Sequence, residues 1–353
     1  MGSKTASFRN ITVVVNPVAG FGAGIALLPR VLERLPQFFP DARITSIETQ
    51  SSAHASEIGA SVSADLLVII GGDGTLHHVV QGVLTRPQHE RPTVSLIAVG
   101  SGNDYARTLG IPSDAALALE ILPEAVSLAV DVGCAEVKDR DETIYYLETL
   151  SFGVDAAVAI NTMELRKTTH TKGLRLYARA AISAVLNELK PFHASCYVDG
   201  SPHEFDLLIC AVQNGPTYGS GFKVAPRASI TDGLLNICVA RRVGTLRALY
   251  YLLRIKSGTH EQLKAFSTFE TSHFEIKLDH QLPVQCDGEQ IFGTHFDIRV
   301  LSGALNVLVP RNAPVLPALA GDTSALPAFV EDAPALPVPA GDSLVLVRDS
   351  SDA

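Results

Sequence analysis

The sequence predicts an α/β domain with a doubly wound parallel sheet, followed by a β-rich, sandwich-like domain. Two observations carry this prediction. Continuous apolar runs, such as residues 11–15 and 65–70, alternate with helical patterns in the first third of the chain, and after Val130 short strand-like segments are separated by turn residues. Buried parallel strands have such uninterrupted apolar runs, whereas many short strands with turn residues indicate an antiparallel domain.

The first domain, residues 1–131, is expected to hold strands and helices in alternation. A strand at 11–15 leads to a helix at 25–39, a strand at 43–49 to a helix from about 51, a strand at 66–70 to a helix ending near 84, and a strand at 94–99 to a GSGND loop. This alternation predicts a parallel sheet covered on both faces. Ligands of such sheets bind at the carboxyl ends of the strands.

The rest of the chain divides into three expected parts. Residues 132–300 form the β-rich acceptor and catalytic domain, interrupted by one helix at about 174–189, and residues 301–312 return to pack on the first domain. Residues 313–353 are rich in alanine and acidic residues and contain six prolines. Prolines at this density prevent a helix or a central strand, so a disordered or weakly docked tail is expected.

Composition narrows the class of protein. With 46% hydrophobic and 18% charged residues, the chain can bury a substantial core. Its five cysteines are scattered, as reduced core residues would be. No signal pattern and no run of the ~18 apolar residues that cross a bilayer is found, so a cytoplasmic protein is expected. The formal charge is −9, which does not favour a nucleic-acid partner. The sequence does not determine the oligomeric state, and a homodimer is one possibility.

Three glycine-bearing loops follow three apolar strands of the first domain, at 16–24, 71–75 and 100–104. Glycine lets the backbone approach a ligand closely, and a following helix offers unpaired N–H groups that suit phosphate. Because the strand ends share one edge of the sheet, the loops should converge on one crevice. The alternative for GGDG taken alone is a tight strand-to-helix turn.

Six motifs carry a family resemblance. They are NPVAG (16–20), GGDGTLHHVVQGVL (71–84), VGSGNDYARTLGIP (99–112), LSFGVDA (150–156), GSGFKVAPRASITDGLLNI (219–237) and CDGE (286–289). In this order they resemble the diacylglycerol kinase family, specifically its soluble bacterial-type lipid kinase branch. The resemblance implies a two-domain fold similar to that of NAD kinases, and an enzyme that uses ATP and Mg²⁺ to phosphorylate a lipid hydroxyl, with diacylglycerol as the leading acceptor.

The resemblance also implies a nucleotide site on the first domain. Its expected residues are Asn16, Pro17, Val18, Ala19, Gly20, Thr49, Gly71, Gly72, Asp73, Gly74, Thr75, Leu76, His77, Ser101 and Asp104. Two carboxylates beside a triphosphate need a bridging cation, which assigns Asp73 and Asp104 to a metal and phosphate network. The alternative for Asp104 is a helix cap.

Two further roles fall on the second domain. The resemblance implies a structural magnesium held by the Asp232 side chain and the carbonyls of Ser229 and Leu234; the alternative is an Asp-Gly turn. Proton transfer from an alcohol needs a carboxylate base. The resemblance assigns this role to Glu289, with Asp287 close by, whereas the alternative is a plain hairpin tip.

This chain departs from the family's pattern in two places. Phe222 and Lys223 replace the more usual Met after the Gly pair, and the other departure follows the glycine-rich motif. The family usually has Asn-Glu after GGDGTL, and this chain has His77 and His78. We expect the His78 side chain to lie outside the phosphate contacts.

A lipid acceptor requires contact with a membrane. Two basic stretches around tyrosines could provide a peripheral contact, unless they are only solvated helix faces. They are Arg166, Lys167, Lys172, Arg175 and Arg179, and Arg241, Arg242, Arg247, Arg254 and Lys256. The competing functions are a sphingoid-base, other lipid-alcohol or NAD kinase, and a catalytically silent lipid-binding module.

Overall fold

The computed structural model describes residues 8–168, 190–198 and 200–316. The expected helix at 174–189 and most of the expected tail therefore lie outside the described residues, as do the side chains of the first basic stretch. Residues 313–316 are described and pack on the first domain, where Ala313 is buried and Val315 and Leu316 contact its core.

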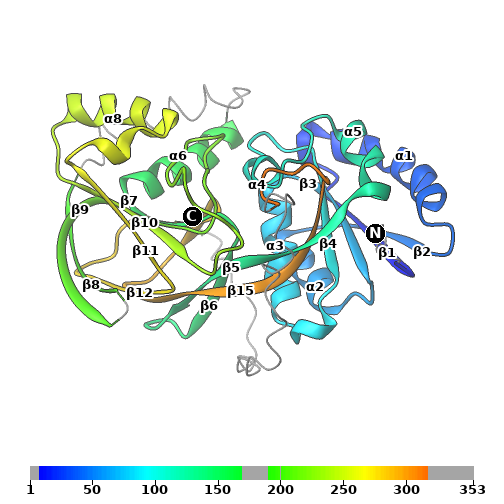
Figure 1. Ribbon diagram of the computed structural model, residues 1–353, viewed down its shortest axis with the longest axis horizontal. Coiled ribbons are helices and arrows are strands. Elements are labelled where there is room, and N and C mark those ends of the chain that lie inside the picture. Colours follow the sequence, from blue (N-terminus) through cyan, green and yellow to red (C-terminus); the bar gives the residue numbers. More distant parts are fainter. Residues whose placement is uncertain (1–7, 169–189, 199, 317–353) are drawn as a thin grey trace, which may run out of the picture.

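The first domain is a parallel sheet flanked by helices (Figure 1). Its strands are β1 (Asn10–Val15), β2 (Arg43–Glu48), β3 (Leu66–Gly71) and β4 (Thr93–Ala98), in the order β4-β3-β1-β2. Its helices are α1 (Ala23–Phe38), α2 (Ser52–Ser61), α3 (Asp73–Leu84), α4 (Asp104–Thr108) and α5 (Ala115–Glu120), with 3-10 turns at Ala19–Phe21, Gln88–Glu90 and Leu122–Glu124. β2 is added on one side of β1, whereas β3 and β4 are added on the other side. Because the crossovers are right-handed, α1 lies on one face of the sheet and α2 and α3 lie on the other.

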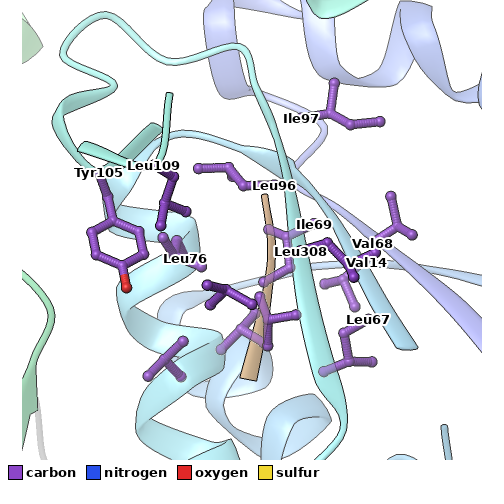
Figure 2. Packing of buried hydrophobic residues seen from close by; sticks show 14 of the residues in the cluster. Val14, Leu67, Val68, Ile69, Leu76, Leu96, Ile97, Tyr105, Leu109 and Leu308 are labelled. Carbon is purple, nitrogen blue, oxygen red and sulfur yellow. The ribbon is translucent and has the colours of Figure 1, made fainter. Parts of the chain in front are cut away.

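The core of this domain explains why its apolar runs are uninterrupted. Every residue of β3 is buried, because helices cover both faces of the sheet. Figure 2 shows Leu76 of α3 and Tyr105 and Leu109, at and just after α4, beside the strand residues, with Leu308 from the end of the chain among them. The start of α3 is thereby fixed against the sheet edge.

The second domain is built of antiparallel strands. They are β5 (Val126–Val137), β6 (Glu142–Tyr146), β7 (Thr149–Gly153), β8 (Phe192–Val198), β9 (Ser201–Gln213), β10 (Leu235–Arg241), β11 (Phe266–Thr271), β12 (His273–Leu278), β13 (Val284–Cys286), β14 (Glu289–Ile291) and β15 (His295–Val309). Helices α6 (Val154–Thr168) and α8 (Thr245–Ser257) and a 3-10 turn at His260–Gln262 complete it. The predicted fold class is confirmed, although the sequence patterns did not predict α6.

Two long strands join the domains. β5 and β15 pair antiparallel from Val126 with Val309 to Val137 with Phe296. Near its end β15 also pairs in parallel with β4, at Val307 and Val94, so one sheet runs through both domains. The expected boundary at residue 131 lies inside β5, and the expected return segment is the end of β15.

Two global features bear on the setting of the protein. All five cysteines are buried and free. Among the described residues, no helix combines the length and the apolar character needed to cross a membrane.

Candidate active site

A cavity of about 560 Å³ lies between the two domains, at the carboxyl ends of β1, β3 and β4. The first domain lines it with its three predicted loops. The second domain lines it with segments 147–149, 218–219 and 285–289. The lining includes every predicted nucleotide residue except Gly71 and His77, and it includes Asp287 and Glu289.

The glycine loops meet backbone to backbone. A Cβ atom on Gly72 would lie 2.9 Å from Gly100 Cα, and one on Gly100 would lie 2.7 Å from Gly72 Cα. Any side chain at either position would push the loops apart. The loop at 16–24 is linked to the start of α3, because Asn16 Nδ2 donates a hydrogen bond to Thr75 Oγ1 at 3.0 Å.

The start of α3 faces this cavity without a side-chain cap. Its N-cap residue is Gly72, which has no side chain to accept a hydrogen bond from the first turn. The first N–H groups of any helix lack intrahelical acceptors. Together with the helix dipole, those of Asp73 to Thr75 form a site for an anion such as a phosphate.

Asp73 connects this helix start to the next loop. Its carboxylate accepts the N–H groups of Asp104 at 3.2 Å and Tyr105 at 3.3 Å. Burial, with the Asp104 carboxylate nearby, raises the pKa of Asp73 to about 6. A cation in the cavity would favour the charged form.

Asp104 reaches across to the second domain. Its two oxygens accept the N–H groups of Ser220 and Gly221, both at 2.7 Å, and it pairs with Arg107. The N-cap of α4 is Asn103, so the Asp104 side chain is not the cap that the alternative proposed. These contacts hold the 218–221 loop against the cavity, and the metal contact of Asp104 stays a prediction.

The hairpin between β13 and β14 supplies the opposite wall. Asp287 and Gly288 have φ values of 47° and 98°, and positive φ at both central residues is what a type I′ turn requires. The Asp287 carboxylate accepts the N–H groups of Leu147, Glu148 and Thr149 at 2.7 to 3.0 Å. Asp287 therefore anchors the hairpin tip, and its predicted share in proton transfer is untested.

Glu289 follows this turn and faces the glycine-rich helix start. A Cβ atom on Gly74 would lie 3.9 Å from Glu289 Oε1. The two replacing histidines lie beside the tip: Nε2 of His78 is 3.5 Å from Glu289 Oε1, and Nδ1 of His77 is 3.3 Å from Asp287 Oδ2. His78 lines the cavity and His77 is buried beside it, and the expectation that the His78 side chain lies outside the phosphate contacts stays a prediction.

The predicted structural magnesium site lies outside the cavity, in an Asp-Gly turn. Asp232 Oδ1 accepts the N–H of Leu234 at 3.0 Å, and Gly233 donates to Asp131 at 2.7 Å. Within the described residues no group of three or more His, Cys, Asp or Glu side chains is arranged to hold a metal. One exposed carboxylate with carbonyls at Ser229 and Leu234 is a donor set that fits a hard cation, and the site stays a prediction.

Two buried acids at or near the site, Glu148 and Asp155, were not predicted as site residues. Burial raises the pKa of Glu148 well above its ordinary value, and the hydroxyl of Thr108 donates to it at 2.6 Å. Asp155 accepts the Tyr218 hydroxyl at 2.9 Å, and burial raises the pKa of Asp155 to about 7. Asp155 lies inside the LSFGVDA motif and Glu148 lies two residues before it, but only the packing shows that both are buried.

A second, smaller pocket adjoins the cavity. It has a volume of about 50 Å³ and is lined mainly by apolar side chains of α6, α8, β9 and β10. Tyr218 and Gly219 line both spaces. An apolar ligand in this pocket would therefore border the polar cavity.

Comparison with protein families finds two matching models. Residues 10–135 match the diacylglycerol kinase catalytic domain, and residues 148–309 match the YegS C-terminal NAD kinase beta sandwich-like domain.

Known proteins similar to this chain span nearly all of it. A probable lipid kinase YegS-like protein from Cronobacter sakazakii is 27% identical over 282 residues, covering 78% of this chain and 88% of that protein. A diacylglycerol kinase from Mycobacterium tuberculosis is 26% identical over 306 residues, covering 86% and 96%. The crystal structure of a putative diacylglycerol kinase from Bacillus anthracis superposes with a TM-score of 0.72 at 23% identity, covering 88% and 98%.

The matches agree with the geometry. The two family models cover consecutive parts of the chain, and the cavity lies where the two parts meet. The chain therefore carries a diacylglycerol kinase catalytic domain followed by a YegS C-terminal NAD kinase beta sandwich-like domain, and it is a kinase.

Proposed function

We propose that this kinase transfers the γ-phosphoryl group of ATP to a lipid hydroxyl, with diacylglycerol as the leading acceptor and phosphatidic acid as the product. The observation that carries the proposal is the shared cavity, in which the glycine-rich start of α3 faces Glu289. The names of the similar proteins, lipid kinase and diacylglycerol kinase, support a lipid as the acceptor.

The two walls divide the reaction between them. N–H groups at the start of α3 and at Ser101 would hold the phosphates. The close contact of Gly72 and Gly100 forms the backbone surface against which these phosphates would lie. Glu289 would take the proton of the acceptor hydroxyl while the oxygen attacks the γ-phosphorus and ADP leaves. Asp287 would keep Glu289 in place through its three backbone contacts.

Magnesium fits the same site. Asp73 is a carboxylate in the first turn of α3, beside the proposed phosphate site. Its pKa is about 6, so it is mostly charged at neutral pH. Mg²⁺ bound there would neutralise charge on the phosphate oxygens.

The setting follows from the substrate. An acceptor with two acyl chains lies in a bilayer, so we infer a protein of the cytoplasm that works at the membrane surface. The five buried, free cysteines are consistent with a reducing compartment.

A transfer assay tests the proposal. Purified protein is incubated with radiolabelled ATP, Mg²⁺ and a panel of lipid alcohols that includes diacylglycerol and a sphingoid base, and the lipids are extracted. We expect label in phosphatidic acid, which the Glu289→Gln protein should not produce. Label in another lipid would show that this lipid, and not diacylglycerol, is the acceptor. If no lipid is labelled although the protein still binds vesicles, a catalytically silent lipid-binding module would be favoured.

A further inference from the structure

Helix α8 carries apolar side chains on two sides. On its inner side Ala248 and Ile255 are buried, and Leu249 and Leu252 pack on the domain. On its outer side Leu246 is 84% exposed, Tyr250 49% and Leu253 70%. Spacings of four and three residues put these three side chains on one stripe. The stripe is too apolar for an ordinary solvated helix face.

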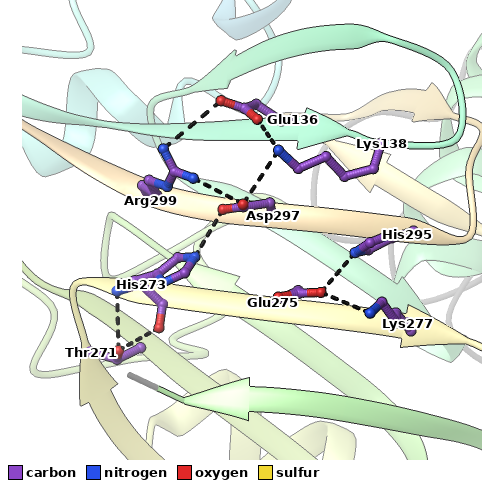
Figure 3. A network of polar contacts seen from close by, with 9 residues as sticks. All are labelled: Glu136, Lys138, Thr271, His273, Glu275, Lys277, His295, Asp297 and Arg299. Atoms are coloured by element: carbon purple, nitrogen blue, oxygen red, sulfur yellow. Dashed lines mark hydrogen bonds and ion pairs between the residues drawn. The ribbon is translucent and has the colours of Figure 1, made fainter. Parts of the chain in front are cut away.

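The stripe is unusual within this molecule. The described residues include seven exposed large hydrophobic side chains, and three of them are on α8. The outer face of the sheet formed by β5, β15 and β12 shows the opposite pattern (Figure 3). There Asp297 pairs with Arg299, His273 and Lys138, and Glu275 pairs with Lys277 and His295. Paired charges suit water, so that face is not an apolar docking surface.

Basic side chains flank the stripe. Arg241, Arg242 and Arg247 are exposed. The salt bridges that arginines form within the described residues include none of these three. The other two members of the second basic stretch serve the fold: Arg254 donates to the Thr259 carbonyl, and Lys256 to those of Ser220 and Gly221.

The position of α8 links the stripe to the active site. Figure 1 shows α8 at the outer end of the second domain, away from the first domain. Leu252 and Ile255 on its inner side line the small apolar pocket, which shares Tyr218 and Gly219 with the interdomain cavity. A lipid that enters from the α8 side would therefore pass apolar surface before its hydroxyl reaches the cavity.

We propose that the outer face of α8, formed by Leu246, Arg247, Tyr250 and Leu253, docks on an anionic lipid bilayer together with Arg241 and Arg242, which lie just before the helix. The proposal rests on the proposed function, which requires an acceptor held in a membrane. A helix with aliphatic and aromatic side chains on one face and arginines beside them lies in the plane of a bilayer interface. The arginines attract anionic headgroups, so the contact weakens as salt screens them.

Vesicle sedimentation without ATP tests the docking. Wild-type protein should bind phosphatidylcholine vesicles that contain phosphatidylglycerol, and bind less as salt rises. The double variant Leu246→Asp with Leu253→Asp should lose at least tenfold in affinity. Leu117→Asp is the matched control, because Leu117 is 58% exposed on the first domain, and it should bind as wild type does. Wild-type binding by the double variant would overturn the proposal.

Two further measurements separate the alternatives. If the double variant does not fold, Arg242→Glu with Arg247→Glu tests the same face and should reduce binding to anionic vesicles tenfold. Gel filtration that shows a wild-type dimer and a monomeric double variant would mean that a second copy covers α8, and would overturn the proposal. Vesicle binding with no lipid phosphorylation would refute the proposed function and support the docking face.

Discussion

The two walls of the interdomain cavity are built by different means. The first domain contributes mostly backbone, since glycine loops touch each other and a helix start lacks a side-chain cap. The second domain contributes side chains, with Asp287 anchoring the hairpin that presents Glu289. The proposed function assigns phosphate binding to the first wall and the acceptor to the second. Substitutions on the two walls should therefore affect different kinetic constants.

The largest effect is expected at Glu289. Glu289→Gln keeps the shape of the side chain but removes the base, so kcat should fall by about 10² to 10⁴, the usual contribution of general base catalysis. KM for ATP should change little, because Glu289 lies on the acceptor wall. Steady-state kinetics with diacylglycerol measures both constants, and an unchanged kcat would exclude Glu289 as the base.

The next effect is expected on the phosphate wall. Gly72→Ala places a Cβ atom 2.9 Å from Gly100 Cα, and overpacking of this kind costs about 1 to 3 kcal/mol. We expect ATP to bind about ten times more weakly, as measured by calorimetry. Gly244→Ala is the control, because nothing lies within 4 Å of its added Cβ atom. Equal ATP affinity in both variants would refute the close contact of the loops.

Asp73 gives a pH-dependent effect on stability. Its pKa is raised in the folded protein to about 6 from the ordinary 3.8. The folded state then binds the proton more tightly than the unfolded state, so stability should fall as pH rises from about 4 to 6 and change little above that. Asp73→Asn should lack this fall. Its unfolding free energy, relative to wild type, should rise by about 2 kcal/mol between pH 4 and 7.5 in denaturant titrations. A difference that does not change with pH would contradict the burial of Asp73.

The smallest effect is expected at His78. It lies 3.5 Å from Glu289 Oε1, and partly exposed pairs of this kind contribute less than about 1 kcal/mol. His78→Asn should change kcat by less than about fivefold in steady-state kinetics. His89→Asn is the control, because His89 pairs with Glu90 on an exposed surface, and it should leave kcat unchanged. A fall in kcat for His78→Asn as large as the one expected for Glu289→Gln would contradict this minor role.

The same division shows what the sequence could predict. The glycine loops and the apolar runs of β1, β3 and β4 are local patterns, so the phosphate wall could be placed from residues 10–104 alone. The acceptor wall depends on contacts between distant segments. Asp104 is 116 residues from Ser220, and Asp287 is 140 residues from Leu147, and no local pattern shows such pairs.

Burial and helix placement were also beyond local patterns. Glu148 resembles an ordinary strand residue, and only the packing of both domains makes it a buried acid. Helix α6 begins directly after β7, and the LSFGVDA motif that spans this junction supported the family resemblance but no helix. His78 lies within α3, but its contact with Glu289 depends on the distant β13-β14 hairpin.

The central claim is that one cavity holds ATP against Glu289. A crystal structure with Mg²⁺ and a non-hydrolysable ATP analogue tests it most directly. The account predicts phosphates on the N–H groups of Asp73 to Thr75, with the γ-phosphate turned toward Glu289. A nucleotide bound elsewhere, or one whose γ-phosphate points away from the hairpin tip, would contradict the account.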